Sequence, residues 1–205
     1  REIVEAAVAG GVTCVQLREK HCGTREFIHE ALALRPLLRD HNIPLIINDR
    51  LDVALAVAAD GVHLGQSDMP IAMARKIAGR SLLIGISAES ADDALKAEQE
   101  GADYIGISPV FSTPTKIDAA PPLGLGGVSK IGGLVDIPLV GIGGLNLSNA
   151  AEVVANGAAG VAVVSAIVSA ENCESAARRL RDVIDEAKGK NDGRWTKDAR
   201  KDEGR

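Results

Sequence analysis

Two aspartates of this sequence, Asp49 and Asp68, have the residue type and the surroundings expected of a magnesium site. Each follows a short apolar run, and neither has an imidazole or thiol partner at metal-ligand spacing. Carboxylate oxygens alone suit Mg²⁺ that bridges to a phosphate or pyrophosphate, and they do not suit zinc. Each residue could instead serve a helix, with Asp49 capping one that begins at Leu51 and Asp68 preceding one at Pro70. The presence of both carboxylates among several cations favours the metal site.

Three cations, Arg18, Lys20 and Lys116, also follow apolar runs, and the pair Gly143-Gly144 follows another. Backbone N–H groups at such glycines, and at the end of the last apolar run, are of the kind that hold phosphate. These groups together predict an anionic substrate that carries phosphate. The histidines are interpreted as structural, because none has a partner at the spacing of metal ligands: His21, His29, His41 and His63.

These side chains need a scaffold in which the ends of many short strands meet. The sequence repeats a short aliphatic run followed by an amphipathic stretch of about 10 to 15 residues, which is typical of βα units. The aliphatic runs are apolar on both faces, as parallel strands are. We expect strands over residues 12–17, 44–48, 61–64, 82–87, 104–110, 139–142 and 161–165.

The intervening stretches predict helices over residues 25–40, 51–59, 71–78, 91–100, 128–134, 148–156 and 171–188. Ser90 is expected to cap one of them, and Ser148 or Asn146 another. Gly101 and Gly157 are expected to end the helices that precede them.

The number of βα units predicts an α/β fold, a (β/α)8 TIM barrel, in which reactive residues lie at the carboxyl ends of the strands. Residues 1–10 have a helical pattern, so the first strand is missing and we expect an N-terminally incomplete chain. Residues 1–188 are predicted to form one barrel domain, and residues 189–205 a disordered polar tail. The loop over residues 112–127 is the longest and is expected to be a lid.

The composition excludes several classes of protein. The 205 residues have a net charge of −5, and the basic segment 188–205 leaves the remaining chain at −8, which argues against a nucleic-acid surface. No apolar run is long enough to cross a bilayer, and the first residues do not resemble a signal peptide. Three cysteines without a CxxC spacing suit reduced thiols. We therefore expect a cytoplasmic protein that binds a small molecule, with no membrane partner, and that can form a homo-oligomer.

Five motifs in order give the sequence a family resemblance. It closely resembles thiamine-phosphate synthase over roughly residues 3–167, through VQLREK (15–20), INDR (47–50), GVHLGQSD (61–68), GISPVFSTPTK (106–116) and GIGG (141–144). The resemblance implies a Mg²⁺-dependent transferase that joins hydroxymethylpyrimidine diphosphate to a thiazole phosphate and releases pyrophosphate.

The resemblance also implies a role for each matching residue. Asp49 and Asp68 would bind Mg²⁺. The pyrimidine diphosphate would be held by Gln16, Arg18, Lys20, Asn48, Ser87 and Lys116. The thiazole phosphate would be held by Thr113, Thr115, Gly144, Val164 and Ser165. We count as catalytic Arg18 and Lys116, which would stabilise the leaving group, and also Ser87.

Two alternatives have their own sequence signatures. A thiazole tautomerase on the same barrel needs a general acid or base, so we would expect a histidine near Ser108 and a loop without Lys116; this sequence has neither change. A non-catalytic binder of thiamine precursors would have lost the carboxylates or the cations, and both sets are present.

Overall fold

The computed structural model describes residues 1–113 and 120–190. Seven strands form one parallel sheet in which each strand pairs with its neighbours in chain order. The strands are β1 (Val15–Leu17), β2 (Leu45–Asn48), β3 (Gly61–Leu64), β4 (Leu83–Ala88), β5 (Tyr104–Ile107), β6 (Leu139–Ile142) and β7 (Gly160–Ala162).

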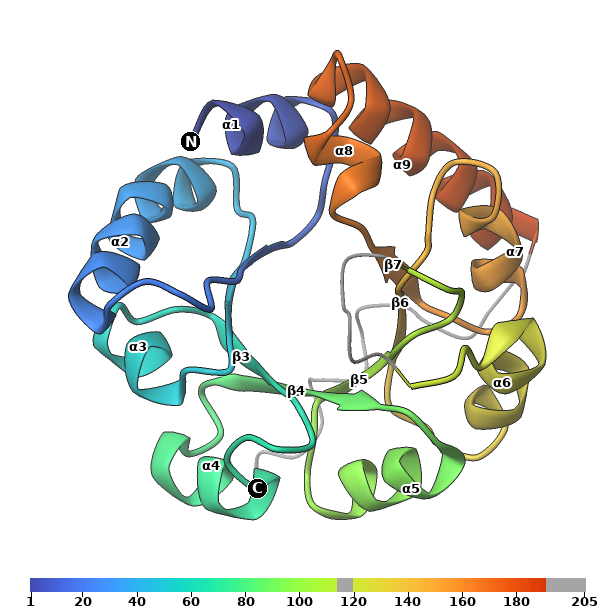
Figure 1. The fold of residues 1–205 in the computed structure, drawn as a ribbon, viewed down its shortest axis with the longest axis horizontal. Helices are drawn as coiled ribbons and strands as arrows, with labels where there is room; N and C mark the ends of the chain where they lie inside the picture. The colour runs from blue at the N-terminus through green and yellow to red at the C-terminus, as the bar shows by residue number, and fades with distance from the viewer. Residues whose placement is uncertain (114–119, 191–205) are drawn as a thin grey trace, which may run out of the picture.

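Helices surround this curled sheet, as Figure 1 shows. They are α1 (Glu2–Ala9), α2 (Thr24–Asp40), α3 (Leu51–Ala56), α4 (Ile71–Ala78), α5 (Ala91–Gln99), α6 (Gly124–Gly132), α7 (Ala150–Ala155), α8 (Ser165–Val168) and α9 (Cys173–Lys190). The predicted α/β barrel architecture is confirmed, and α1 precedes β1 as the helical pattern of residues 1–10 predicted. The short helix α8 was not predicted, because four residues are too few to show a helical period.

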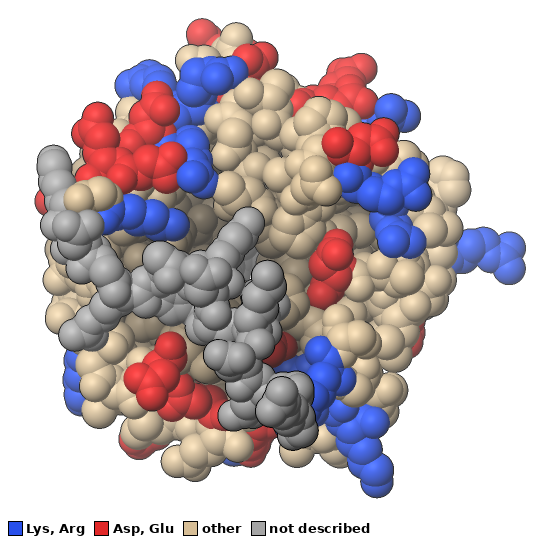
Figure 2. Space-filling view, turned by 180° about the vertical axis from the view of Figure 1, so that it is seen from behind, with Lys and Arg blue, Asp and Glu red and all other residues tan. Residues whose placement is uncertain are grey.

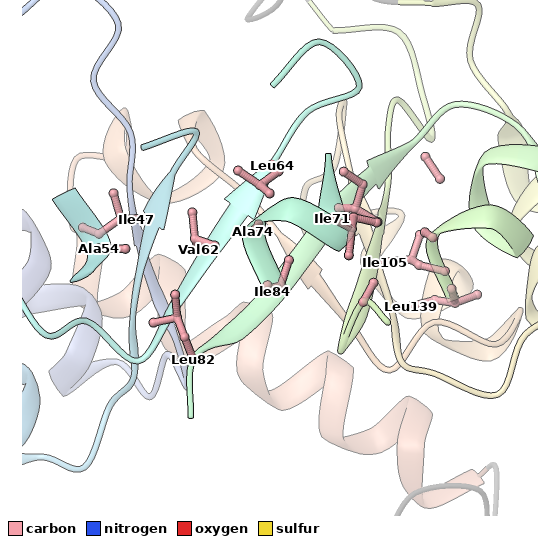
Figure 3. Close-up of a cluster of buried hydrophobic side chains, with 14 of the residues drawn as sticks. Ile47, Ala54, Val62, Leu64, Ile71, Ala74, Leu82, Ile84, Ile105 and Leu139 are labelled. Atoms are coloured by element: carbon pink, nitrogen blue, oxygen red, sulfur yellow. The ribbon is translucent and has the colours of Figure 1, made fainter. Parts of the chain in front are cut away.

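The outer face of the sheet packs against the helices through aliphatic side chains. Ile47, Val62 and Ile84 lie in register on β2, β3 and β4, and none of the three is exposed to solvent. Figure 3 shows them beside Ala54 of α3 and Ala74 of α4. Burying one side chain of this size contributes about 1.5 to 3 kcal/mol, so this layer holds the strands in place.

The inner face of the sheet is more polar than the outer face. Side chains alternate along a strand, so the residues between the outer aliphatic ones point inward. These inner positions hold Gln16, Asn48, His63, Ser87 and Tyr104. Two inner glycines make room for the ring side chains: a Cβ at Gly85 would overlap the Tyr104 ring, and one at Gly106 would lie 2.9 Å from His63 Cε1.

Several predicted boundaries need correction. Helix α6 begins at Gly124, four residues before the predicted start, because its first turn is rich in glycine and has no helical pattern. The predicted lid over residues 112–127 is therefore shorter, and its centre lies outside the described residues. The residue that precedes α7 is Asn149 rather than Ser148 or Asn146.

Helix α3 ends at Ala56, three residues before the predicted end. The other predicted capping residues agree with the structure. The Ser90 hydroxyl accepts a hydrogen bond from the Asp93 backbone N–H (3.1 Å). Gly101 and Gly157 have left-handed backbones, with φ of 89° and 109°, and each follows the residue that caps the end of α5 or α7. Glycine adopts this conformation without strain, which explains why both helices end there.

The predicted tail falls mostly outside the described residues. Helix α9 continues to Lys190, two residues beyond the predicted end of the barrel domain, and residues 191–205 are not described. Within residues 1–113 and 120–190, no helix combines the length and hydropathy that a membrane span requires.

Replacing Gly85 by alanine tests the packing of the inner face. We expect Gly85→Ala to lower the free energy of unfolding by about 1 to 3 kcal/mol, because the added methyl group overlaps the Tyr104 ring. Urea unfolding measures this change. Gly126→Ala is the control, since Gly126 lies exposed in α6 with open space around it, and this variant should gain up to about 1 kcal/mol. Equal stabilities for the two variants would contradict the packing.

Candidate active site

Asp49 leaves strand β2 in a left-handed conformation, with φ of 63°. Its backbone N–H donates to the carbonyl oxygen of His63 on the neighbouring strand (2.8 Å). Aspartate tolerates this conformation better than most residues do, although it remains uncommon. The hydrogen bond therefore fixes Asp49 at the carboxyl end of β2 before the chain enters α3.

A second carboxylate and a lysine meet Asp49 at this point. The Lys20 Nζ lies 3.4 Å from Asp49 Oδ2, and Asp68 from the loop after β3 lies within hydrogen-bonding contact of Asp49. Asp68 Oδ2 also accepts a hydrogen bond from the Gly65 backbone N–H (2.6 Å). The loops after three neighbouring strands, β1, β2 and β3, thus bring one cation and two carboxylates together. We call Lys20, Asp49 and Asp68 the carboxylate cluster.

The surroundings of Asp68 disfavour its negative charge. Burial raises the pKa of the Asp68 carboxyl, and the neighbouring Asp49 carboxylate raises it further. The Gly65 N–H and Lys20 act in the opposite direction but do not cancel the rise. Two carboxylates that repel each other in a partly buried place gain most from a bound cation.

The donor set fits Mg²⁺. This ion is usually held by one or two carboxylates, with water and substrate phosphate as the remaining ligands. Among the described residues, no group of three or more His, Cys, Asp or Glu side chains could hold a metal by itself. A cation at Asp49 and Asp68 therefore needs oxygen ligands from solvent or from a substrate.

The structure excludes the helix-capping alternative for both aspartates. Arg50 precedes α3 and Pro70 precedes α4, and neither helix has a side-chain cap. The Asp68 carboxylate instead turns back to the Gly65 N–H, which lies before the helix. Both carboxylates remain directed to the cluster.

A chain of hydrogen bonds crosses the inner face below the carboxylate cluster. His63 Nε2 lies 3.0 Å from Ser87 Oγ, and His63 Nδ1 lies 2.9 Å from the Tyr104 hydroxyl. The Gln16 side chain forms a hydrogen bond with the same hydroxyl. The Ser87 backbone carbonyl also accepts a hydrogen bond from Gln66 Nε2 (2.6 Å). The side chain and the backbone of Ser87 are therefore both held by residues of β3 and its loop.

The sequence interpretation missed the position of two residues, His63 and Tyr104. His63 was interpreted as structural, yet it lies between Ser87 and Tyr104 and is only 4% exposed. Alternation along the strand from Gly61 to Leu64 was the available signal, because it places His63 on the inner face. Burial lowers the pKa of His63 to about 4, so its imidazole is neutral at pH 7.

The remaining predicted cations differ in what the structure shows. Arg18 is exposed just beyond the end of β1. The turn that carries Lys20 is fixed by Glu19, whose carboxylate accepts hydrogen bonds from the backbone N–H groups of Lys20 (2.7 Å) and His21 (2.9 Å). Lys116 and Thr115 lie outside the described residues.

The glycine pair after β6 lies against the chain that follows β5. Gly143 and Gly144 have φ of 94° and 66°, and a Cβ at Gly144 would lie 2.6 Å from the Ser112 carbonyl oxygen. Only glycine fits this close approach, which brings the loop after β6 against Phe111 and Ser112, the residues that precede Thr113. Val164 and Ser165 are exposed where α8 begins.

Comparison with known proteins decides the family. The sequence matches the family described as thiamine monophosphate synthase over residues 1–167. The chain belongs to the thiamine monophosphate synthase family.

Individual relatives support the assignment to the thiamine monophosphate synthase family. The thiamine-phosphate synthase of Chloroflexus aurantiacus is 55% identical over 90% of this chain and 85% of its own length. That of Moorella thermoacetica is 50% identical over 92% of this chain and 90% of its own. The solved structure of a thiamine phosphate pyrophosphorylase from Pyrococcus furiosus is 45% identical, with a TM-score of 0.86 over 91% of this chain and 89% of that one.

These matches confirm the predicted family and function, that of a thiamine-phosphate synthase and hence a transferase. The tautomerase alternative is not favoured, because the relatives compared above carry the synthase activity in their names. The residue roles implied by the resemblance are not tested by the matches and stay predictions.

His63 makes the stability of the protein depend on pH. Burial lowers its pKa from the usual 6.5 to about 4, while the Asp49 charge acts in the opposite direction. The unfolded chain therefore binds a proton more readily, and the free energy of unfolding decreases as the pH falls through this window. When the pH falls from 7 to 5, the free energy of unfolding of the unmodified protein should decrease by about 2 kcal/mol more than that of His63→Gln. Urea unfolding at the two pH values measures this difference.

The exposed His41, at the end of α2, supplies the control. The His41→Gln variant should lose stability with falling pH as the unmodified protein does. If His63→Gln followed the same curve, the buried imidazole would not be the cause.

Proposed function

We propose that the rim formed by the carboxyl ends of the strands is the active site, and that it joins hydroxymethylpyrimidine diphosphate to a thiazole phosphate. The observation that supports this most is the carboxylate cluster of Lys20, Asp49 and Asp68. It places paired carboxylates and a cation at one edge of the barrel, as binding of a metal and a diphosphate requires.

Asp49 and Asp68 would hold the Mg²⁺ ion. When bound, the ion supplies positive charge that neutralises the diphosphate oxygens as they leave. The contact between Asp68 and Asp49 supports this assignment, because burial and the neighbouring carboxylate raise the pKa of Asp68 and a bound cation would offset both effects.

The pyrimidine diphosphate would lie over the first four strands. Gln16, Asn48 and Ser87 line the inner face there, and the sequence places Arg18 and Lys20 just above them. The amide and hydroxyl groups can bind the polar edge of the pyrimidine, while the cations bind the diphosphate. Lys116 would add a third cation from the loop after β5.

The thiazole phosphate would bind at the opposite edge of the rim. Gly144 lies against the chain near Thr113, and the backbone at such a glycine can approach a phosphate closely. Thr115, Val164 and Ser165 complete the proposed set, as the family resemblance implies.

In the reaction, the thiazole nitrogen forms a bond to the methylene carbon of the pyrimidine. The bond between that carbon and the diphosphate oxygen breaks, and pyrophosphate leaves with the electron pair. No protein nucleophile takes part in this step. Arg18 and Lys116 would stabilise the growing negative charge on pyrophosphate, and Ser87 would hold the pyrimidine in place.

The proposed partners are small phosphorylated molecules in the cytoplasm. On the face shown in Figure 2, Lys and Arg side chains lie beside Asp and Glu side chains around the edge of the molecule, without forming a continuous basic surface. Such a mixed surface suits a site that binds a small anion locally better than one that follows a nucleic-acid backbone.

Replacing Asp68 by asparagine tests the metal assignment. We expect Asp68→Asn to lower kcat/KM by about a hundredfold or more at ordinary Mg²⁺, because one of two metal ligands loses its charge. A coupling assay that follows thiamine phosphate and pyrophosphate, with and without Mg²⁺, measures this.

Asp40→Asn is the matched control, since the Asp40 side chain is 69% exposed at the far end of α2. That variant should keep full activity. Full activity of Asp68→Asn would refute the metal site, and a folded unmodified protein that makes no thiamine phosphate would refute the proposed reaction.

Replacing Gly144 by alanine tests the proposed thiazole phosphate site. We expect Gly144→Ala to raise the KM for thiazole phosphate about tenfold and to leave the KM for the pyrimidine diphosphate within about twofold, the loss expected when one close phosphate contact is displaced. Gly157→Ala is the control, because Gly157 also has a left-handed backbone, with φ of 109°, but lies in open space after α7. A similar change in both variants would assign the effect to backbone strain alone.

A further inference from the structure

We propose that Tyr104 and His63 are positioning residues that turn the Ser87 hydroxyl proton toward the substrate. The proposal rests on the proposed function, because it concerns the pyrimidine part of that active site. It assigns a direction to the hydrogen bonds that link Gln16, Tyr104, His63 and Ser87.

The donor and acceptor roles in this chain of hydrogen bonds are assigned first at Tyr104. The Tyr104 hydroxyl has two hydrogen-bond partners, the Gln16 side chain and His63 Nδ1. The Gln16 amide can donate as well as accept, and the neutral imidazole nitrogen of His63 is the more basic acceptor at this hydroxyl, so we assign the Gln16 N–H as the donor to the Tyr104 oxygen. The Tyr104 O–H is then free to donate to the other neighbour, which is His63 Nδ1 at 2.9 Å.

The His63 imidazole carries one proton, and this fixes which of its two nitrogens donates a hydrogen bond. A neutral imidazole has one N–H donor and one acceptor nitrogen. If Nδ1 accepts from Tyr104, the proton must lie on Nε2, which is 3.0 Å from Ser87 Oγ. His63 is 4% exposed, so water does not compete for either nitrogen.

Ser87 is the last residue in this chain of hydrogen bonds. Its oxygen accepts from His63 Nε2, so its own O–H proton does not point back to the imidazole. The Ser87 backbone is also held, because Gln66 Nε2 donates to its carbonyl oxygen (2.6 Å). Ser87 therefore presents one hydrogen-bond donor to the barrel mouth, and this donor suits a lone pair such as that of a pyrimidine ring nitrogen.

Two glycines of the inner face make room for the rings of Tyr104 and His63. Gly85 and Gly106 leave the space that the Tyr104 and His63 rings fill, and a side chain at either position would displace a ring. The two rings lie with their centroids 5.5 Å apart. The fold thus provides room for these two residues at the level of Ser87.

The first test reads the tautomer of His63 directly. In ¹⁵N-labelled protein without substrate, the nitrogen resonances of His63, assigned by comparison with His63→Gln, should show the proton on Nε2. A proton on Nδ1 would reverse the direction and overturn the proposal. This measurement needs no turnover, so it is independent of whether the proposed reaction occurs.

The second test is a double-mutant cycle in the coupling assay. Tyr104→Phe keeps the ring and removes only the hydroxyl, and we expect it to lower kcat/KM for the pyrimidine diphosphate roughly fivefold, the value of one neutral hydrogen bond. In a Ser87→Ala background the same change should have less than about a twofold effect, because Tyr104 acts through Ser87.

Equal losses in both backgrounds would overturn the positioning role. The thiazole phosphate KM should not change in either variant. Replacement of His63 supplies a rescue: His63→Gln retains an N–H that can donate to Ser87 and should keep more activity than His63→Leu, which has none. Equal activities of these two folded variants would contradict the proposal.

Discussion

The packing of aliphatic strand residues against the surrounding helices fixes the ends of the strands, and the proposed active site depends on those ends. Val62 and Ile84 are fully buried on the outer face, next to small residues of the helices such as Ala74. Strands β2 and β3 are held in this way, and Val15 and Leu17 of β1 pack against the same core, so the loops that follow these three strands begin at fixed positions. Lys20, Asp49 and Asp68 can then meet although they lie far apart in the sequence.

The two faces of the sheet serve different purposes. The outer face contributes stability through burial of apolar area, and the inner face holds polar groups that are costly to bury unless they are paired. His63 illustrates this cost, since its burial keeps the ring neutral and both of its nitrogens have hydrogen-bond partners. These buried polar groups lie on the face of the sheet that carries the proposed pyrimidine site.

The sequence predicted the architecture well because aliphatic runs and amphipathic stretches recur with clear periods. Boundaries were less accurate where the local signal was weak, as at the glycine-rich start of α6. The sequence also indicated Asp49 and Asp68, since both follow apolar runs, and the structure brings them together. It did not indicate the link between His63 and Tyr104, because that contact depends on the register of β3, β4 and β5, which the sequence does not contain locally.

The contact between Gly85 and Tyr104 has a consequence for the evolution of this protein. The two positions are paired across β4 and β5, and the space between them accommodates the Tyr104 ring only because position 85 has no side chain. A mutation that adds volume at position 85 is acceptable only after position 104 has become smaller. Homologues should therefore change these two positions together, and lineages that keep the tyrosine should keep the glycine.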